Sequence, residues 1–321
     1  MVKKEEVKTI LIIGIAGGLA QLTAKKLARK YPGARIVGVD TRGPGKNLNV
    51  KNLTFIQIRY TRSSFEALFR NNVFDLVYHL GRIPNTILLI EGLEKKRVKF
   101  NVIGTNLILD LCLKFMVKKV VVLSTSYVYG AISDNPVFIC EDDPLRASLK
   151  YPDLHDVVEM DRISSNWMWK NRDSIKTIIL RPCHIVGPNI NNTINQYLKS
   201  DYVPVPMDFN PMFQFIDEDD MARVLTVGVE KLPTGVYNVA PDEYVSILQA
   251  KKIIGSSGFR IPFFLLGSVA GIVRKFGNFM PEYLVDYLKF ACLIDNSSMK
   301  KYLGKDFFRH DTKKTLKRLS G

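Results

Sequence analysis

The first 185 residues alternate between short apolar runs and longer segments in which apolar and polar positions mix. The short runs are rich in β-branched residues and predict strands at 9–13, 35–39, 53–58, 75–79, 120–124 and 177–181. The longer segments have helical spacing and lie at 19–30, 64–71, 92–115 and 152–170. Strands that alternate with helices of this length are typical of βαβ units, so we predict an α/β protein with a doubly wound parallel sheet.

The pattern changes after Gly187–Pro188, where prolines interrupt the apolar runs and helices with turns follow from 246 to 321. We therefore predict two coupled parts. Residues 1–187 form a nucleotide-binding domain, and residues 188–321 form a smaller, mostly helical α/β lobe for the substrate. A strand at 235–240 is expected to return to the first domain.

The turn after the first predicted strand carries Gly14, Gly17, Gly18 and Ala20, and a helix follows directly. Glycines allow a tight turn and let the backbone approach a pyrophosphate, while the helix N-terminus offers unpaired N–H groups. The pattern predicts a dinucleotide-binding turn. The alternative is that the glycines serve the turn alone.

An acidic residue, Asp40, closes the second predicted strand 20 residues after Ala20. A carboxylate at this place accepts hydrogen bonds from the adenosine ribose and repels the extra phosphate of NADP. NAD is therefore the predicted cofactor. Arg42 lies close enough to weaken this preference without reversing it, so NADP remains the less favoured alternative.

Composition narrows the class of protein. The chain has 321 residues, 46% of them apolar, and a net charge of +15. The basic residues are scattered and lack interleaved aromatics, so solvated helix faces are favoured over a nucleic-acid surface. The four cysteines are far apart without a CxxC pair, which favours free thiols in a reducing compartment and predicts no metal site. With no signal-peptide pattern before residue 9, we expect a cytoplasmic protein.

One later segment, 261–273, is strongly apolar and has basic flanks. It is too short to cross a bilayer as a helix. Two interpretations remain: association with an anionic membrane surface, or a first helix of the small lobe lying over the substrate pocket. The second is favoured.

Five further segments join the glycine turn in one order: 75–81 (DLVYHLG), 101–107 (NVIGTNL), 123–130 (LSTSYVYG), 180–188 (LRPCHIVGP) and 215–220 (FIDEDD). With them the chain resembles a divergent member of the extended short-chain dehydrogenase/reductase superfamily, in its NAD-dependent epimerase/dehydratase family. The resemblance implies a Rossmann-type fold and oxidoreductase chemistry by hydride transfer on a hydroxyl or keto carbon. The resemblance further implies a small-molecule substrate, for which a nucleotide sugar is a candidate.

The resemblance also implies which residues hold the cofactor. Besides the turn, Asp40 and Arg42, these are Leu80, Gly81, Asn101, Ser124, Tyr151 and His155. By the same resemblance Thr125 donates a hydrogen bond to the substrate oxygen and Tyr151 is the base. His155, four residues later, occupies the position where the family has a lysine.

This histidine leaves three interpretations open. His155 replaces the lysine as a working cation, or the site has lost fast hydride chemistry, or His155 is a solvent-facing residue of the helix. The second makes the chain an NAD-binding protein with a regulatory or scaffold role instead of an epimerase, dehydratase or reductase.

The substrate side departs from the family as well. Ser126, His184 and Gln214 are expected to contact the substrate, but His184 replaces an asparagine and Gln214 lies where an arginine usually holds the diphosphate. Arg59 replaces the aspartate that accepts from the adenine. A homodimer through helices at 88–115 and 151–170 is expected from the resemblance alone.

Overall fold

The structure, a computed structural model, describes residues 7–44, 48–83, 92–276 and 281–320. Its centre is a seven-stranded parallel sheet of order β11-β6-β5-β4-β1-β2-β3. The strands are β1 (Thr9–Ile13), β2 (Arg35–Asp40), β3 (Leu53–Gln57), β4 (Leu76–His79), β5 (Lys119–Leu123), β6 (Lys176–Pro182) and β11 (Gly235–Val239). The doubly wound α/β prediction is confirmed. The strand order reverses between β1 and β4, which is where ligands bind in open sheets of this kind.

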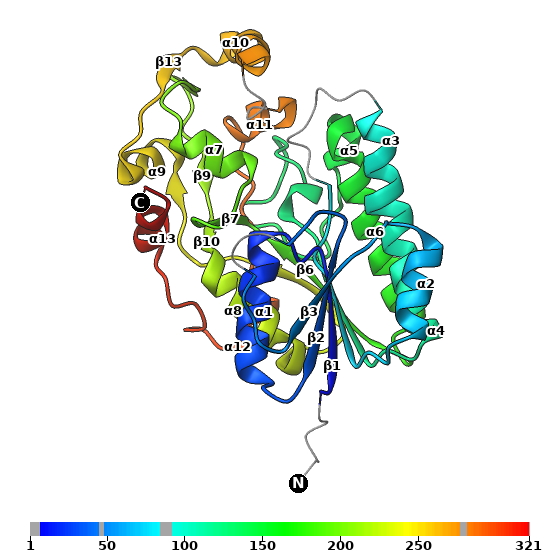
Figure 1. Ribbon diagram of the computed structural model, residues 1–321. Coiled ribbons are helices and arrows are strands. Elements are labelled where there is room, and N and C mark those ends of the chain that lie inside the picture. The colour runs from blue at the N-terminus through cyan, green and yellow to red at the C-terminus, as the bar shows by residue number, and fades with distance from the viewer. Residues whose placement is uncertain (1–6, 45–47, 84–91, 277–280, 321) are drawn as a thin grey trace.

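Helices cover both faces of the sheet (Figure 1). One face carries α1 (Gly18–Lys30) and α8 (Glu218–Lys231), which pack against each other. The other carries α2 (Arg62–Arg70), α4 (Gly104–Lys114) and α6 (His155–Lys170). Because successive strand residues point to opposite faces, Ile10 and Ile12 pack in the cluster with α1, whereas Leu11 and Ile13 pack with α2 and α4.

The second part of the chain forms a smaller lobe beside the carboxyl ends of the strands (Figure 1). Its helices are α7 (Thr193–Lys199), α9 (Ile247–Ile254), α10 (Phe263–Phe276), α11 (Glu282–Tyr287), α12 (Ser297–Leu303) and α13 (Thr312–Ser320). Its strands are short and form three pairs: β7 (His184–Val186) with β10 (Phe215–Asp217), β9 (Met212–Phe213) with β12 (Val245–Ser246), and β8 (Pro204–Pro206) with β13 (Phe259–Ile261). In contrast, β11 lies beside β6 in the large sheet, where the strand at 235–240 was expected to return.

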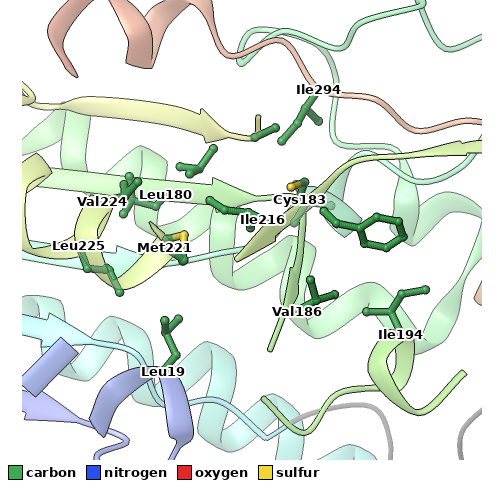
Figure 2. Packing of buried hydrophobic residues seen from close by; sticks show 14 of the residues in the cluster. Leu19, Leu180, Cys183, Val186, Ile194, Ile216, Met221, Val224, Leu225 and Ile294 are labelled. Carbon is green, nitrogen blue, oxygen red and sulfur yellow. The ribbon is translucent and has the colours of Figure 1, made fainter. Parts of the chain in front are cut away.

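The hydrophobic core continues from the large sheet into the smaller lobe. Figure 2 shows Leu19 of α1, Cys183 after β6 and Ile194 of α7 within one buried cluster. These three side chains also line a pocket described below. The core therefore fixes both walls of that pocket relative to each other.

The helical region predicted at 92–115 is three consecutive elements: α3 (Leu93–Arg97), the π-helix η1 (Val98–Ile103) and α4. A π-helix inserts an extra residue per turn and changes which side chains face inward. Here it places Asn101 in the interior. Residues 88–91 of the predicted dimer helix lie outside the described residues.

Candidate active site

The glycine turn closes directly onto the end of β4. Gly14 has φ +89°, and a Cβ atom built on it would lie 2.4 Å from the Cα of Gly81. Gly17 donates its N–H to the carbonyl of Gly14 at 3.0 Å, and α1 begins at the next residue. Gly18 is needed for a different contact, because a Cβ there would lie 1.9 Å from the carbonyl oxygen of Asn189. The turn thus leaves a backbone cradle before the N-terminus of α1 that side chains would fill.

The carboxylate of Asp40 is buried at the end of β2 and faces this turn. It accepts hydrogen bonds from the backbone N–H of Ala16 and of Arg42, each at 3.0 Å. The Arg42 guanidinium also pairs with it, with Nε 3.2 Å from Oδ1, while 69% of the Arg42 side chain remains exposed. An arginine so exposed can leave the carboxylate when another partner for either group arrives.

A pocket, here called the Asp40 pocket, opens between the turn and the ends of β2, β3 and β4. Its lining is mostly apolar and aromatic: Ile13, Gly14, Val39, Asp40, Thr41, Arg42, Ile58, Tyr60, Phe65, Gly81, Arg82, Ile83 and Phe100. Tyr60 stacks on Phe100 with ring centroids 3.6 Å apart, and its buried hydroxyl has no hydrogen-bond partner among the described residues. Arg59, by comparison, is exposed and is absent from the described lining of the pocket.

A second pocket, here called the Thr125 pocket, lies beyond the ends of β5 and β6. Its polar lining consists of Arg82, Ser124, Thr125, Tyr127, His184, Asn192, Thr193 and Tyr283. Arg82 and Ile83 line both pockets, so the two pockets adjoin. A ligand that reaches from the Asp40 carboxylate to Thr125 must pass these two residues.

The end of β5 is held by a buried charged network. Asp161 of α6 accepts two hydrogen bonds from Arg181, at 2.7 and 3.0 Å, and one from the hydroxyl of Ser124. Arg181 also donates to the hydroxyl of Tyr129 at 2.9 Å. The ion pair outweighs burial and raises the pKa of Arg181. Thr125, the next residue along, is therefore presented to the pocket from a fixed backbone.

A second buried network holds the segment after β4. The side chain of Asn101 accepts from the N–H of Ile83 at 2.8 Å and donates to its carbonyl at 3.0 Å. Asn101 also donates to Asp156, which pairs with Arg97 while both are almost fully buried. Asn101 lies outside the described linings of both pockets and acts through Ile83.

The structure does not bring Tyr151 and His155 to either pocket. The Tyr151 hydroxyl lies 2.9 Å from both the carbonyl of Ala131 and the carboxylate of Asp286. Burial and this carboxylate raise the pKa of Tyr151, the opposite of what a base requires. His155 is the exposed first residue of α6, whereas Leu154 and Val157 line the Thr125 pocket.

The three predicted substrate residues differ in their places. His184 lines the Thr125 pocket, and burial lowers its pKa to about 4, so the ring is neutral. Gln214 is buried and bonds the backbone of Pro241 and Ile294. Ser126 is buried at the start of a short 3-10 turn and is not part of the described pocket lining.

Sequence reasoning missed Arg82, Tyr127 and Tyr283. The position of Arg82 directly after the end of β4 was a usable signal, because residues at the carboxyl ends of parallel strands meet at one edge. Tyr283 comes from α11, far along the chain, and had no such signal. The Tyr127 ring packs edge-on against Tyr283, with centroids 5.4 Å apart.

The described residues provide neither a metal-binding cluster nor a membrane-spanning helix. Among them, no group of three or more histidines, cysteines or carboxylates is arranged to hold a metal ion. No helix in the same ranges is long and apolar enough to cross a membrane.

Residues 10–240 match the model of a family described as the NAD dependent epimerase/dehydratase family. The chain belongs to this family. The chain is 23% identical over 303 residues to an uncharacterized protein of Mycobacterium tuberculosis, covering 92% of this chain and 79% of that protein. It is 28% identical over 264 residues to the dTDP-D-glucose 4,6-dehydratase of Mus musculus, covering 77% and 72%.

Solved structures share the epimerase/dehydratase fold. The UDP-glucose 4-epimerase of Thermotoga maritima, determined with UDP-glucose, aligns with a TM-score of 0.75 at 19% identity and covers 97% of both chains. The dTDP-glucose 4,6-dehydratase of Bacillus anthracis, determined with NAD, aligns with a TM-score of 0.73 at 16% identity, covering 98% of this chain and 95% of that one. At such identities the likeness extends to the fold alone.

Proposed function

We propose that this family member transfers hydride between NAD and a hydroxyl or keto carbon of a nucleotide sugar, as an epimerase or dehydratase. The observation that carries the proposal is the pair of adjoining pockets, one formed by the glycine turn and Asp40, the other by Thr125. The family and the relatives named above support the reaction class. A homodimer remains a prediction from the resemblance, and a cytoplasmic location remains a prediction from the sequence.

The described residues fit NAD. Gly14 and Gly81 leave the backbone cradle for the pyrophosphate, and Asp40 offers a buried acceptor for the ribose hydroxyls. When bound, NAD supplies the hydride acceptor. The apolar side chains of Ile58 and Phe100 give the Asp40 pocket the walls that an adenine ring requires.

On the substrate side, Thr125 and Tyr127 supply hydroxyl groups to the pocket. Burial raises the pKa of Tyr127 as it raises that of Tyr151, so what distinguishes Tyr127 is its place in the lining of the Thr125 pocket, within reach of a substrate oxygen. We assign the proton-transfer role to Tyr127 instead of to the Tyr151–His155 pair that the resemblance implies. The engagement of Tyr151 by Ala131 and Asp286 supports this choice.

Two measurements test the proposal. The first is calorimetric titration of the purified protein with NAD⁺, NADH, NADP⁺ and NADPH, with analysis of any nucleotide released on denaturation. Saturable NAD binding is expected, and absence of binding by every dinucleotide would refute the proposal. The second is turnover of UDP-glucose and dTDP-glucose, followed by separation of the sugar nucleotides.

Matched variants then assign the proton-transfer residue. Tyr127→Phe should lower turnover by about 100-fold or more while NAD still binds, because a general acid contributes at least this factor. Tyr151→Phe should retain turnover within about threefold, since its hydroxyl makes a structural contact. The reverse result would establish Tyr151 and remove Tyr127 from the mechanism.

A further inference from the structure

One cation lies where the two pockets meet. Arg82 follows Gly81 at the end of β4 and lines both pockets. In the described lining of the Thr125 pocket it is the sole residue with a full charge at neutral pH, because the neighbouring His184 is neutral. The other polar groups there are mostly hydroxyls, which donate hydrogen bonds as readily as they accept them.

Charged and hydroxyl groups of the substrate side interact with Arg82. The ionisable groups that most influence Arg82 are Tyr283, Asp156, Tyr127 and Arg97. Tyr127 and Tyr283 line the Thr125 pocket. Asp40, which lines the other pocket, is not among these groups, although its carboxylate would be the natural partner of an arginine turned that way.

No described residue neutralises this charge. Asp156 is already paired with Arg97 in the buried network, and no hydrogen bond or ion pair joins Arg82 to any residue within the described ranges. Surrounding protein lowers the pKa of the Arg82 guanidinium although the side chain remains accessible from the pocket. The side chain is exposed, so an anionic ligand can reach a guanidinium that no described residue pairs.

No cation comes from the position where the family resemblance expects one. Gln214 occupies the position where the family resemblance expects an arginine for the diphosphate, and its amide is consumed by backbone groups of Pro241 and Ile294. Arg82 lines the Thr125 pocket from the end of β4. An arginine fork suits phosphate and carboxylate oxygens equally well.

We propose that Arg82 binds an anionic group of the substrate in the Thr125 pocket, either the diphosphate of a nucleotide sugar or a carboxylate on its sugar. This inference rests on the proposed function and adds a substrate-recognition residue to it. The hydroxyls of Tyr127 and Tyr283 lie in the same lining and are available to the same anion.

The test measures binding to the NAD-loaded protein by calorimetry, with UDP-glucose and UDP-glucuronate as probes. Arg82→Met is compared with Arg59→Met, which removes an exposed arginine outside the described pocket linings. Arg82→Met should weaken binding by about 10- to 100-fold, the usual range for a hydrogen bond to a charged group. Arg59→Met should leave binding unchanged, and Arg82→Lys should recover part of the loss.

The outcomes separate the sources of the anion. Equal loss for both probes supports the diphosphate, and loss confined to UDP-glucuronate supports the sugar carboxylate. If Arg82→Met weakens NAD⁺ alone, or changes no affinity, the inference is overturned while the proposed function stands. If NAD binds but neither probe binds the wild-type protein, the nucleotide-sugar proposal fails and the inference with it.

Discussion

At the scale of single residues, Gly14 sets the geometry of the cofactor turn. Its φ of +89° and the 2.4 Å approach of Gly81 leave no room for a side chain. Gly14→Ala should therefore weaken NAD⁺ binding at least tenfold and lower the free energy of unfolding by about 1–3 kcal/mol, the cost of a residue forced into a strained conformation. Calorimetry and urea unfolding measure the two effects.

Gly81→Ala is the matched control. A Cβ at Gly81 would lie 3.0 Å from the Cα of Gly14, and its φ is outside the left-handed region. The neighbouring atoms are backbone of Gly14, but Gly81 needs no left-handed conformation, so we expect a smaller loss than for Gly14→Ala. Equal effects of the two substitutions would contradict the role given to the conformation of Gly14.

Arg42 offers a second test at this scale, on the choice between NAD and NADP. Its guanidinium offsets the charge of Asp40. Arg42→Ala should leave an unpaired carboxylate that repels the extra phosphate, so the ratio of NADP⁺ to NAD⁺ dissociation constants should rise by about fivefold. Asp40→Asn should move the same ratio in the opposite direction. An unchanged ratio in both variants would show that neither residue contributes to discrimination between NAD and NADP.

At the scale of elements, the buried pair of Arg97 and Asp156 joins α3 to the first turn of α6. Removing one partner leaves the other charge buried, so Arg97→Met should lower the free energy of unfolding by about 3–5 kcal/mol. The exposed pair of Arg162 and Glu159 within α6 is the comparison. Arg162→Ala should cost about 0.5 kcal/mol or less, and a similar cost for both variants would disprove the anchoring role.

The start of α6 marks the limit of what the sequence could predict about the site. The sheet followed from its β-branched runs, and β1 has the predicted bounds. The spacing of Tyr151 and His155 predicts a shared helix face only if helix joins them. Tyr151 instead has extended backbone because Pro152 follows, and α6 begins at His155, so the two residues do not share a helix face.

The remaining site residues illustrate the other limit of sequence reasoning. Arg82, Tyr127 and Tyr283 meet in one pocket although they come from segments separated by many residues. Arg82 and Tyr127 follow the neighbouring strands β4 and β5, whereas Tyr283 joins them through the packing of α11, which no local pattern encodes. Gly14 and Asp40 were accessible from spacing, whereas Thr125 came from the family resemblance.

For the whole molecule, two buried histidines predict the response of stability to acid. Burial lowers the pKa of His79 and of His184 to about 4. Between this value and the unfolded value of about 6.5, the unfolded state binds protons that the folded state does not, so stability falls as pH falls. Each histidine should cost up to about 2 kcal/mol at pH 5.

Urea unfolding at pH 7 and pH 5 measures this loss. Replacing either residue by glutamine should reduce the difference between the two pH values by about half of the histidine contribution. If both single variants keep the full wild-type difference, other groups govern the acid response.

The place of β11 in the sheet has a consequence for synthesis on the ribosome. β6 ends at Pro182, but its neighbour β11 begins at Gly235, so roughly 50 residues must be translated in between, taking about 3–10 s at ordinary elongation rates. During this interval the nascent chain presents an apolar strand edge that nearby polypeptides can pair with. Faster translation of residues 183–234 shortens that exposure, so synonymous codon choice in this stretch should affect the yield of folded protein without changing a single contact.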